Sequence, residues 1–172
     1  MDNTPKPKVT GKTAVITGGS QGSGRETAFL FARKGYNVVI CAREPARLQS
    51  VADEIVKAIP TASVLAIPTD ITQRDSVDDF IDIISDTYES VSVLVNNAGV
   101  CLSGSFADTT LEDWDSQVAV NLMGAVMVTQ GLLEPLTESK TIHHSLDASA
   151  GARTIHPLLL MPVLEPGPST SL

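Results

Sequence analysis

Cysteine is scarce in this sequence of 172 residues, which contains only Cys41 and Cys101. A disulfide framework or a cysteine-rich zinc site is therefore not expected, and the reducing cytoplasm is the predicted location. Long hydrophobic runs are also missing, because the longest apolar stretches fall far short of the ~20 residues that a membrane span needs. Residues 1–8 contain no apolar segment of the kind found in secretory signals, so we expect a short flexible tail there.

Positively charged residues are also fewer than negatively charged ones. The chain has 12 Lys and Arg residues against 20 Asp and Glu residues, and its formal net charge is −8. An acidic surface repels polyanions, so this balance argues against a nucleic-acid partner and against an anionic membrane surface. Apolar residues still make up 42% of the chain, which is enough for the core of one folded domain.

Short apolar runs alternate with longer amphipathic stretches over most of the chain. Strands are predicted at residues 13–17, 37–42, 63–67 and 91–95, and helices at residues 23–34, 45–59, 75–88 and 110–133. Pro45 is expected to begin the second helix, and Pro135 to close the last one. Strands that are apolar on both faces and separated by helices indicate an α/β fold. We therefore predict a Rossmann-type, doubly wound parallel sheet of about four to five strands.

The last part of the chain has a different composition. Residues 141–172 contain three charged residues and four of the ten prolines, and neither helical nor strand periodicity persists there. We expect a domain at residues 9–140, followed by an atypical tail at 141–172 that is poorly ordered. One hypothesis for the abrupt change is a truncated or frameshifted reading frame after about residue 140.

A glycine-rich turn follows the first predicted strand and opens the first helix. Gly18, Gly22 and Gly24 are spaced G-x3-G-x-G. Such a turn lets a diphosphate approach the backbone, and the helix N-terminus offers the anion its unpaired N–H groups. The alternative is an ordinary turn without a ligand. A P-loop is excluded, because the sequence contains no G-x4-G-K-[ST].

The residue after the second predicted strand bears on the choice of cofactor. An acid at this place binds a free ribose 2′-hydroxyl, whereas a basic residue accommodates a 2′-phosphate. This chain has Arg43 there, and Arg43 precedes the first acid, Glu44. The sequence therefore favours NADP(H) over NAD(H). The alternative is that Arg43 is a solvated loop residue.

Four features together resemble the short-chain dehydrogenase/reductase family. They are, in chain order, Thr17-Gly-x-x-x-Gly-x-Gly24, Asp70-Ile71, Asn96-Asn97-Ala98-Gly99 and Asn121. The resemblance covers roughly residues 9–138. One departure is Ser23, because the family usually has an aliphatic residue at this position.

The resemblance implies a role for each matching residue. Gly18, Ser20, Gln21, Gly22 and Gly24 would line the pyrophosphate and the adenosine ribose. Asp70 and Ile71 would border the adenine, and Asn97, Ala98 and Gly99 would lie near the nicotinamide-side ribose. Asn121 would support a water molecule of a proton relay. The partner implied is a small alcohol or carbonyl substrate.

The family's catalytic Tyr-x3-Lys pair is absent from this sequence. The tyrosines are Tyr36 and Tyr88, both before the Asn-Asn-Ala-Gly motif, and no lysine follows Lys140. Ser149, in Ser149-Ala150-Gly151, is the residue that comes nearest to matching the region of the family's catalytic serine. We expect no metal site, because the histidines at 143, 144 and 156 have no spaced carboxylate or cysteine partner.

Two classes of function follow from these observations. The first is an NADP(H)-dependent oxidoreductase of carbonyls and alcohols by resemblance, with little activity in this chain because the Tyr-x3-Lys pair is absent. The second is a catalytically silent nucleotide-binding or interaction module, which could form a homo-oligomer or pair with a longer relative through the 110–133 helix. A defective gene-model fragment is a further alternative.

Overall fold

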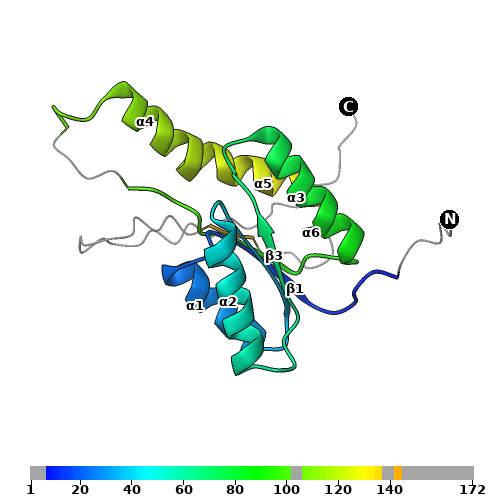
Figure 1. Ribbon diagram of the computed structural model, residues 1–172. Helices are drawn as coiled ribbons and strands as arrows, with labels where there is room; N and C mark the ends of the chain where they lie inside the picture. The colour runs from blue at the N-terminus through cyan, green and yellow to red at the C-terminus, as the bar shows by residue number, and fades with distance from the viewer. Residues whose placement is uncertain (1–6, 102–105, 137–141, 145–172) are drawn as a thin grey trace, which may run out of the picture.

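A parallel β-sheet forms the centre of the molecule. The computed structural model describes residues 7–101, 106–136 and 142–144. Within these residues the sheet has five strands in the order β3-β2-β1-β4-β5, and every neighbouring pair is parallel. Figure 1 labels β1 and β3 at the centre of the molecule. The strands are β1 (Thr13–Thr17), β2 (Asn37–Ala42), β3 (Val64–Pro68), β4 (Val93–Asn96) and β5 (Ile142–His144). The predicted Rossmann-type parallel sheet is confirmed.

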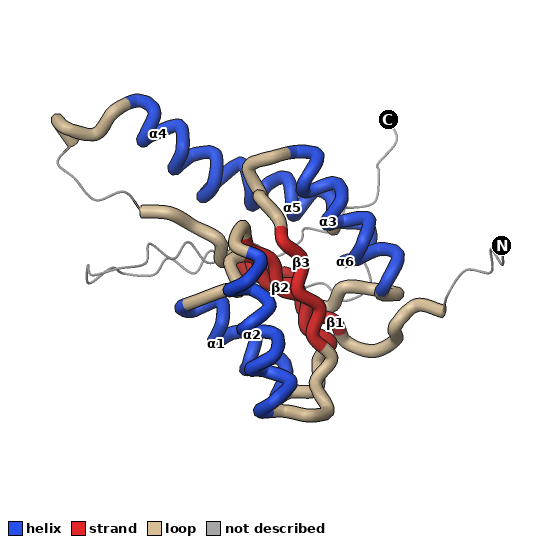
Figure 2. The backbone as a smooth tube through the Cα atoms, viewed as in Figure 1, coloured by secondary structure: helices blue, strands red, loops and turns tan. Residues whose placement is uncertain are grey.

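Helices cover both faces of this sheet (Figure 2). The helices α1 (Gly22–Arg33) and α2 (Pro45–Ala58) pack on one face, and Pro45 occupies the start of α2 as predicted. The helices α3 (Arg74–Thr87), α5 (Ala125–Gly131) and α6 (Leu133–Leu136) pack on the other. The fold is therefore doubly wound, as the alternation of strands and helices predicted.

Alternate residues of each central strand enter two separate cores. Ala14 and Ile16 of β1 pack with Phe29 of α1 and Leu48 of α2. Val15 lies between them in the chain and packs instead in the core that contains Phe80 of α3. This two-residue period explains why the strands are apolar throughout, because side chains on both faces are buried.

The predicted long helix at 110–133 consists of several segments. α4 (Leu111–Val118) begins with a capping box, in which Asp113 N–H donates to Thr110 Oγ1 at 3.1 Å and Thr110 N–H donates to Asp113 Oδ2 at 3.0 Å. A π-helical segment, η1 (Ala119–Gly124), connects α4 to α5.

The prediction that Pro135 closes this helix is wrong. α5 ends at Gly131, and Pro135 lies inside the short helix α6. Proline is tolerated there because the first residues of a helix need no intrahelical partner for their N–H groups. The Pro135 carbonyl accepts a hydrogen bond from Val91 N–H at 2.9 Å, and β4 accordingly begins at Val93 rather than at the predicted residue 91.

Strand β5 was not predicted. It pairs with β4 in the register Leu94↔Ile142 and Asn96↔His144, directly beyond the expected domain boundary at residue 140. Residues 1–6 and 145–172, which contain most of the two predicted tails, lie outside the described residues. Within the described part of the chain, no helix is both long and apolar enough to cross a membrane.

The core around Phe80 generates a stability prediction. Phe80 is fully buried, so Phe80→Ala should lower the free energy of unfolding by about 3–5 kcal/mol through lost burial and a cavity. Phe106 is 83% exposed, and the matched change Phe106→Ala should cost less than about 1 kcal/mol. Urea unfolding followed by circular dichroism measures both, and equal losses would contradict this description of the core.

Candidate functional site: a crevice at the carboxyl ends of the strands

The loops that follow β1, β2, β3 and β4 surround one cavity of about 490 Å³. The cavity lies where the strand order reverses, because β1 is flanked by β2 on one side and β4 on the other. Ligands of open α/β sheets bind at such switch points. It is lined by Gly18, Ser20, Gln21, Gly22, Ser23, Cys41, Ala42, Arg43, Glu44, Arg47, Thr69, Asp70, Ile71, Asn97, Ala98, Gly99, Val100 and Val120.

The glycine-rich loop connects β1 to the start of α1 beside this cavity. Gly18 and Gly22 have φ angles of +69° and +55°, which side chains with a Cβ rarely adopt. Gln21 is the N-cap residue of α1, its side chain makes no capping hydrogen bond, and the first turn contains no acidic residue. The N-terminus of α1 is therefore chemically suited to an anion.

Hydrogen bonds join this loop to the segment that follows β4. Thr17 Oγ1 accepts from the backbone N–H groups of Asn97 and Ala98, both at 3.0 Å. The side-chain amide of Asn97 donates to the carbonyl oxygens of Thr17 at 3.0 Å and Gly18 at 3.3 Å. We call these four contacts the Thr17–Asn97 clamp. The clamp fixes the distance between the two loops that form the middle of the crevice.

Gly24 lies behind the clamp rather than in the cavity. A Cβ on Gly24 would come within 2.3 Å of the Gly18 carbonyl oxygen and 2.4 Å of Asn97 Nδ2. Only a residue without a side chain lets α1 approach the loop this closely. Gly24 thus acts through packing, whereas every other predicted cofactor-binding residue lines the cavity.

Two arginines lie at the end of the cavity next to β2. Arg43 directly follows this strand, and Arg47 lies one helical turn further along the chain, in α2. Arg47 Nη1 donates to Gln21 Oε1 at 2.7 Å, so the glycine-rich loop is tied to α2 as well. Arg47 was not predicted, because its place at the cavity depends on where α2 begins and on its contact with Gln21.

The residues after β3 and within β2 form the floor of this end. Asp70 Oδ1 accepts from Thr72 N–H at 3.0 Å and from Thr72 Oγ1 at 2.8 Å, so this carboxylate organises the turn before α3. Ile71 is buried beside it. Burial raises the pKa of the Cys41 thiol to about 12, against smaller opposing effects of hydrogen bonds with Gly18 and Thr69. Cys41 is therefore a neutral, inert part of the wall at physiological pH.

Comparison with protein families decides the classification. Residues 12–141 match the model of the short chain dehydrogenase family. This chain belongs to that family.

Relatives of known sequence agree with this assignment. An uncharacterized oxidoreductase of Staphylococcus aureus (strain USA300) is 33% identical over 135 residues, which are 78% of this chain and 57% of that protein. An uncharacterized oxidoreductase of Staphylococcus epidermidis is 29% identical over 136 residues, with 79% and 57% covered. The chain thus spans a little more than half the length of these curated relatives.

Solved structures share the fold. L-sorbose reductase from Gluconobacter frateurii, complexed with NADPH and L-sorbose, has a TM-score of 0.73 and 29% identity, covering 80% of this chain and 52% of that one. An alcohol dehydrogenase from the archaeon Thermococcus sibiricus, complexed with 5-hydroxy-NADP, has a TM-score of 0.71 and 30% identity, with 74% and 54% covered. This chain therefore shares its fold with both of these enzymes.

Asn121, predicted from the family pattern, lies in the π-helical segment η1. Its side chain binds one backbone residue twice: Oδ1 accepts from Val100 N–H and Nδ2 donates to the Val100 carbonyl oxygen, both at 2.8 Å. Asn121 thereby anchors the segment after β4 to the long helix. It does not itself line the cavity, but its neighbour Val120 and its partner Val100 do.

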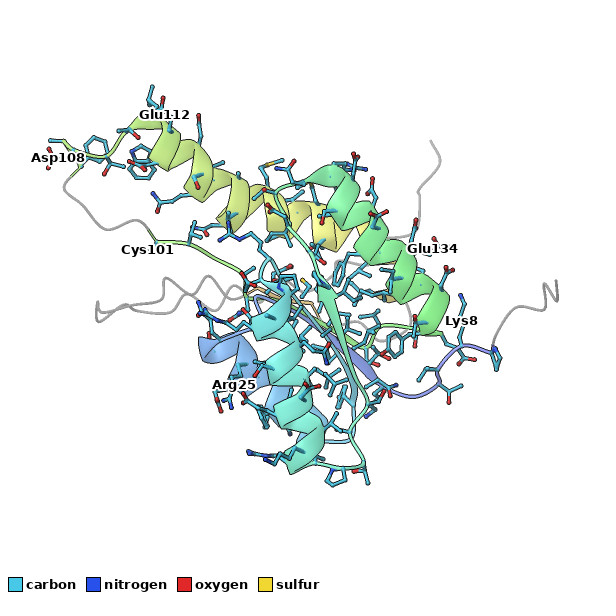
Figure 3. The ribbon with its side chains drawn as sticks, viewed as in Figure 1. Lys8, Arg25, Cys101, Asp108, Glu112 and Glu134 are labelled. Carbon is cyan, nitrogen blue, oxygen red and sulfur yellow. The ribbon has the colours of Figure 1, made fainter. Side chains whose placement is uncertain are left out.

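The two tyrosines lie at the opposite end of the strands from the cavity. Tyr36 precedes β2 and Tyr88 precedes β4, so both are at the amino ends of the strands. Tyr36 packs edge-on against Phe31, with ring centroids 5.0 Å apart. Tyr88 is buried in the core, and this burial raises the pKa of its hydroxyl. Figure 3 shows Lys8, whose neighbour Val9 bridges to Tyr88, on the far side of the molecule from Cys101, which follows β4.

The remaining predictions concern residues outside this cavity. Ser149 lies outside the described residues. Within the described ranges, no cluster of three or more His, Cys, Asp or Glu side chains could hold a metal ion. Ser23, which the sequence marked only as a departure from the family pattern, lines the cavity as well. Nothing in a linear pattern shows which loop its hydroxyl faces.

Proposed function

We propose that this chain binds NADP(H) across the crevice, with the diphosphate at the N-terminus of α1. The observation that carries the proposal is the uncapped, glycine-rich start of α1, which faces a cavity of about 490 Å³ at the switch point of the sheet. The adenosine half would lie toward Arg43 and Asp70, and the nicotinamide half toward residues 97–99.

The charges at the β2 end support NADP(H) over NAD(H). Arg43 and Arg47 both line the cavity, and both are exposed enough to reach a bound phosphate. A guanidinium group pairs with phosphate oxygens through parallel N–H bonds, which an unphosphorylated ribose cannot match. Two relatives of known structure were complexed with NADPH or an NADP derivative, which agrees with this choice.

The reaction that we propose for the family to which this chain belongs is the reversible reduction of a small carbonyl compound. When bound, the nicotinamide supplies a hydride to the carbonyl carbon, and an acid must supply the proton to the oxygen. This sequence has no Tyr-x3-Lys pair, and its tyrosines lie at the amino ends of the strands, whereas the crevice lies at their carboxyl ends. We therefore propose binding of the dinucleotide with little turnover.

A cytoplasmic location remains a prediction from the low cysteine content.

The exposed helix supports a second candidate function, self-association as a binding module. Four apolar residues follow one another at four-residue spacing, and each is more than a third exposed. They are Trp114, Val118, Leu122 and Val126. α4 contains no buried residue, and Figure 3 shows its labelled Glu112 far from the sheet. Apolar stripes of this kind pair with a second helix, and we propose a second copy of this chain as the partner.

The binding proposal predicts a separation between affinity and activity. NADPH added to the folded 172-residue chain should raise its melting temperature and change NADPH fluorescence with saturation. Reduction of a panel of small ketones and sugars should stay at the rate without protein, because the sequence has no Tyr-x3-Lys pair to supply the proton. Turnover at ordinary enzyme rates, or a folded chain that leaves NADPH fluorescence unchanged, would contradict the proposal.

The preference for the 2′-phosphate predicts a selective effect of Arg43→Ala. Loss of a charge-assisted pair should weaken NADPH binding about tenfold and leave NADH binding unchanged. Arg74→Ala is the control, because Arg74 is exposed on α3 and pairs with Asp78 there. Fluorescence titrations with both cofactors measure the ratio. An equal loss for NADPH and NADH in Arg43→Ala would refute the assigned role.

The self-association proposal predicts that Leu122→Glu makes the chain monomeric. Leu122 is 56% exposed in the middle of the stripe, and a buried carboxylate would oppose pairing there. Leu30→Glu is the control, since Leu30 is 50% exposed but lies on α1. Sedimentation equilibrium decides the matter: the unchanged chain and Leu30→Glu should be dimers, and a monomeric unchanged chain would disprove the proposal.

A further inference from the structure

One contact from α1 supplements the Thr17–Asn97 clamp. Ser23 Oγ donates to Asn97 Oδ1 at 2.9 Å. Ser23 belongs to the first turn of α1, and Asn97 follows β4, 74 positions further along the chain. The side chain of Asn97 is thus held by the loop after β1 and by the helix that this loop opens.

The chemistry of these partners fixes which way the amide of Asn97 points. The carbonyl oxygens of Thr17 and Gly18 can only accept, so the NH₂ group must face them. The amide oxygen then points toward α1 and requires a donor, because Asn97 is only 8% exposed. Ser23 supplies that donor. An aliphatic residue, which the family usually has at this position, donates no hydrogen bond.

We propose that Ser23 is a positioning residue, which holds Asn97 and through it the backbone of residues 97–99 along the cofactor. This inference rests on the proposed binding of NADP(H). The clamp lies between the α1 N-terminus and the β4 side of the cavity, whereas Arg43 and Asp70 lie on the β2 and β3 side. Ser23 therefore acts on the half of the crevice assigned to the nicotinamide nucleotide and leaves the adenosine half unaffected.

Two ligands distinguish this role from a general effect on the fold. Ser23→Ala should weaken binding of NADPH about fivefold, the equivalent of one lost hydrogen bond. Binding of adenosine 2′,5′-bisphosphate, which has no nicotinamide half, should change less than twofold. Ser23→Thr keeps the hydroxyl and should restore NADPH binding. Equal losses for both ligands, no loss for either, or failure of the threonine variant to rescue would overturn the inference.

A measurement without nucleotide separates this inference from the proposed function. The Ala98 N–H donates to Thr17 Oγ1 within the clamp, so its hydrogen exchange reports on how firmly residues 97–99 are held. In Ser23→Ala this amide should exchange about fivefold faster, while the Ile16 amide in β1 keeps its rate. Unchanged exchange at Ala98 would overturn the positioning role, whether or not the unchanged chain binds NADPH.

Discussion

The hydroxyl group of Thr17 is the contact on which the crevice depends. It accepts two backbone N–H groups, those of Asn97 and Ala98, which lie 80 and 81 positions further along the chain. Thr17 is almost fully buried, so these donors and this acceptor have no water to replace their partner. The clamp therefore holds the end of β1 against the segment after β4, where a parallel sheet would otherwise leave two independent loops.

The rest of the site follows from this junction and from the strand order. Because β1 lies between β2 and β4, the helices after β1 and β4 leave on opposite faces of the sheet, and a gap opens between their connections. The glycines at 18 and 24 let the backbones approach, and the α1 N-terminus faces the gap. Asn121 anchors the far wall through Val100. The described residues thus form the crevice that we propose for the dinucleotide.

Local patterns predicted the elements well where one physical rule determined them. The strands at 13–17 and 37–42 were predicted to the residue, because they are apolar on both faces and bounded by turns. The predicted helix start at residue 110 was also correct, because Thr110 is the N-cap residue of α4 and forms a capping box there. Strand β5 was not predicted because it is only three residues long and is recognised by its pairing with β4. The predicted helix end at Pro135 was wrong because proline is also compatible with the first turn of a helix.

The site was predictable as a set of motifs but not as a set of contacts. Spacing identified Gly18 and Gly22 as loop residues, yet the bond between Ser23 and Asn97 depends on how two distant loops meet.

A nitrogen-15 NMR titration of the folded chain with NADPH shows directly whether the dinucleotide binds across the crevice. Saturable shifts are expected for the amides of residues 17–24, 43, 44, 46, 47, 69–71 and 97–100, while the amides of α4 (Leu111–Val118) stay unaffected. Shifts confined to α4, or none at saturating NADPH, would show that the dinucleotide does not bind in the crevice.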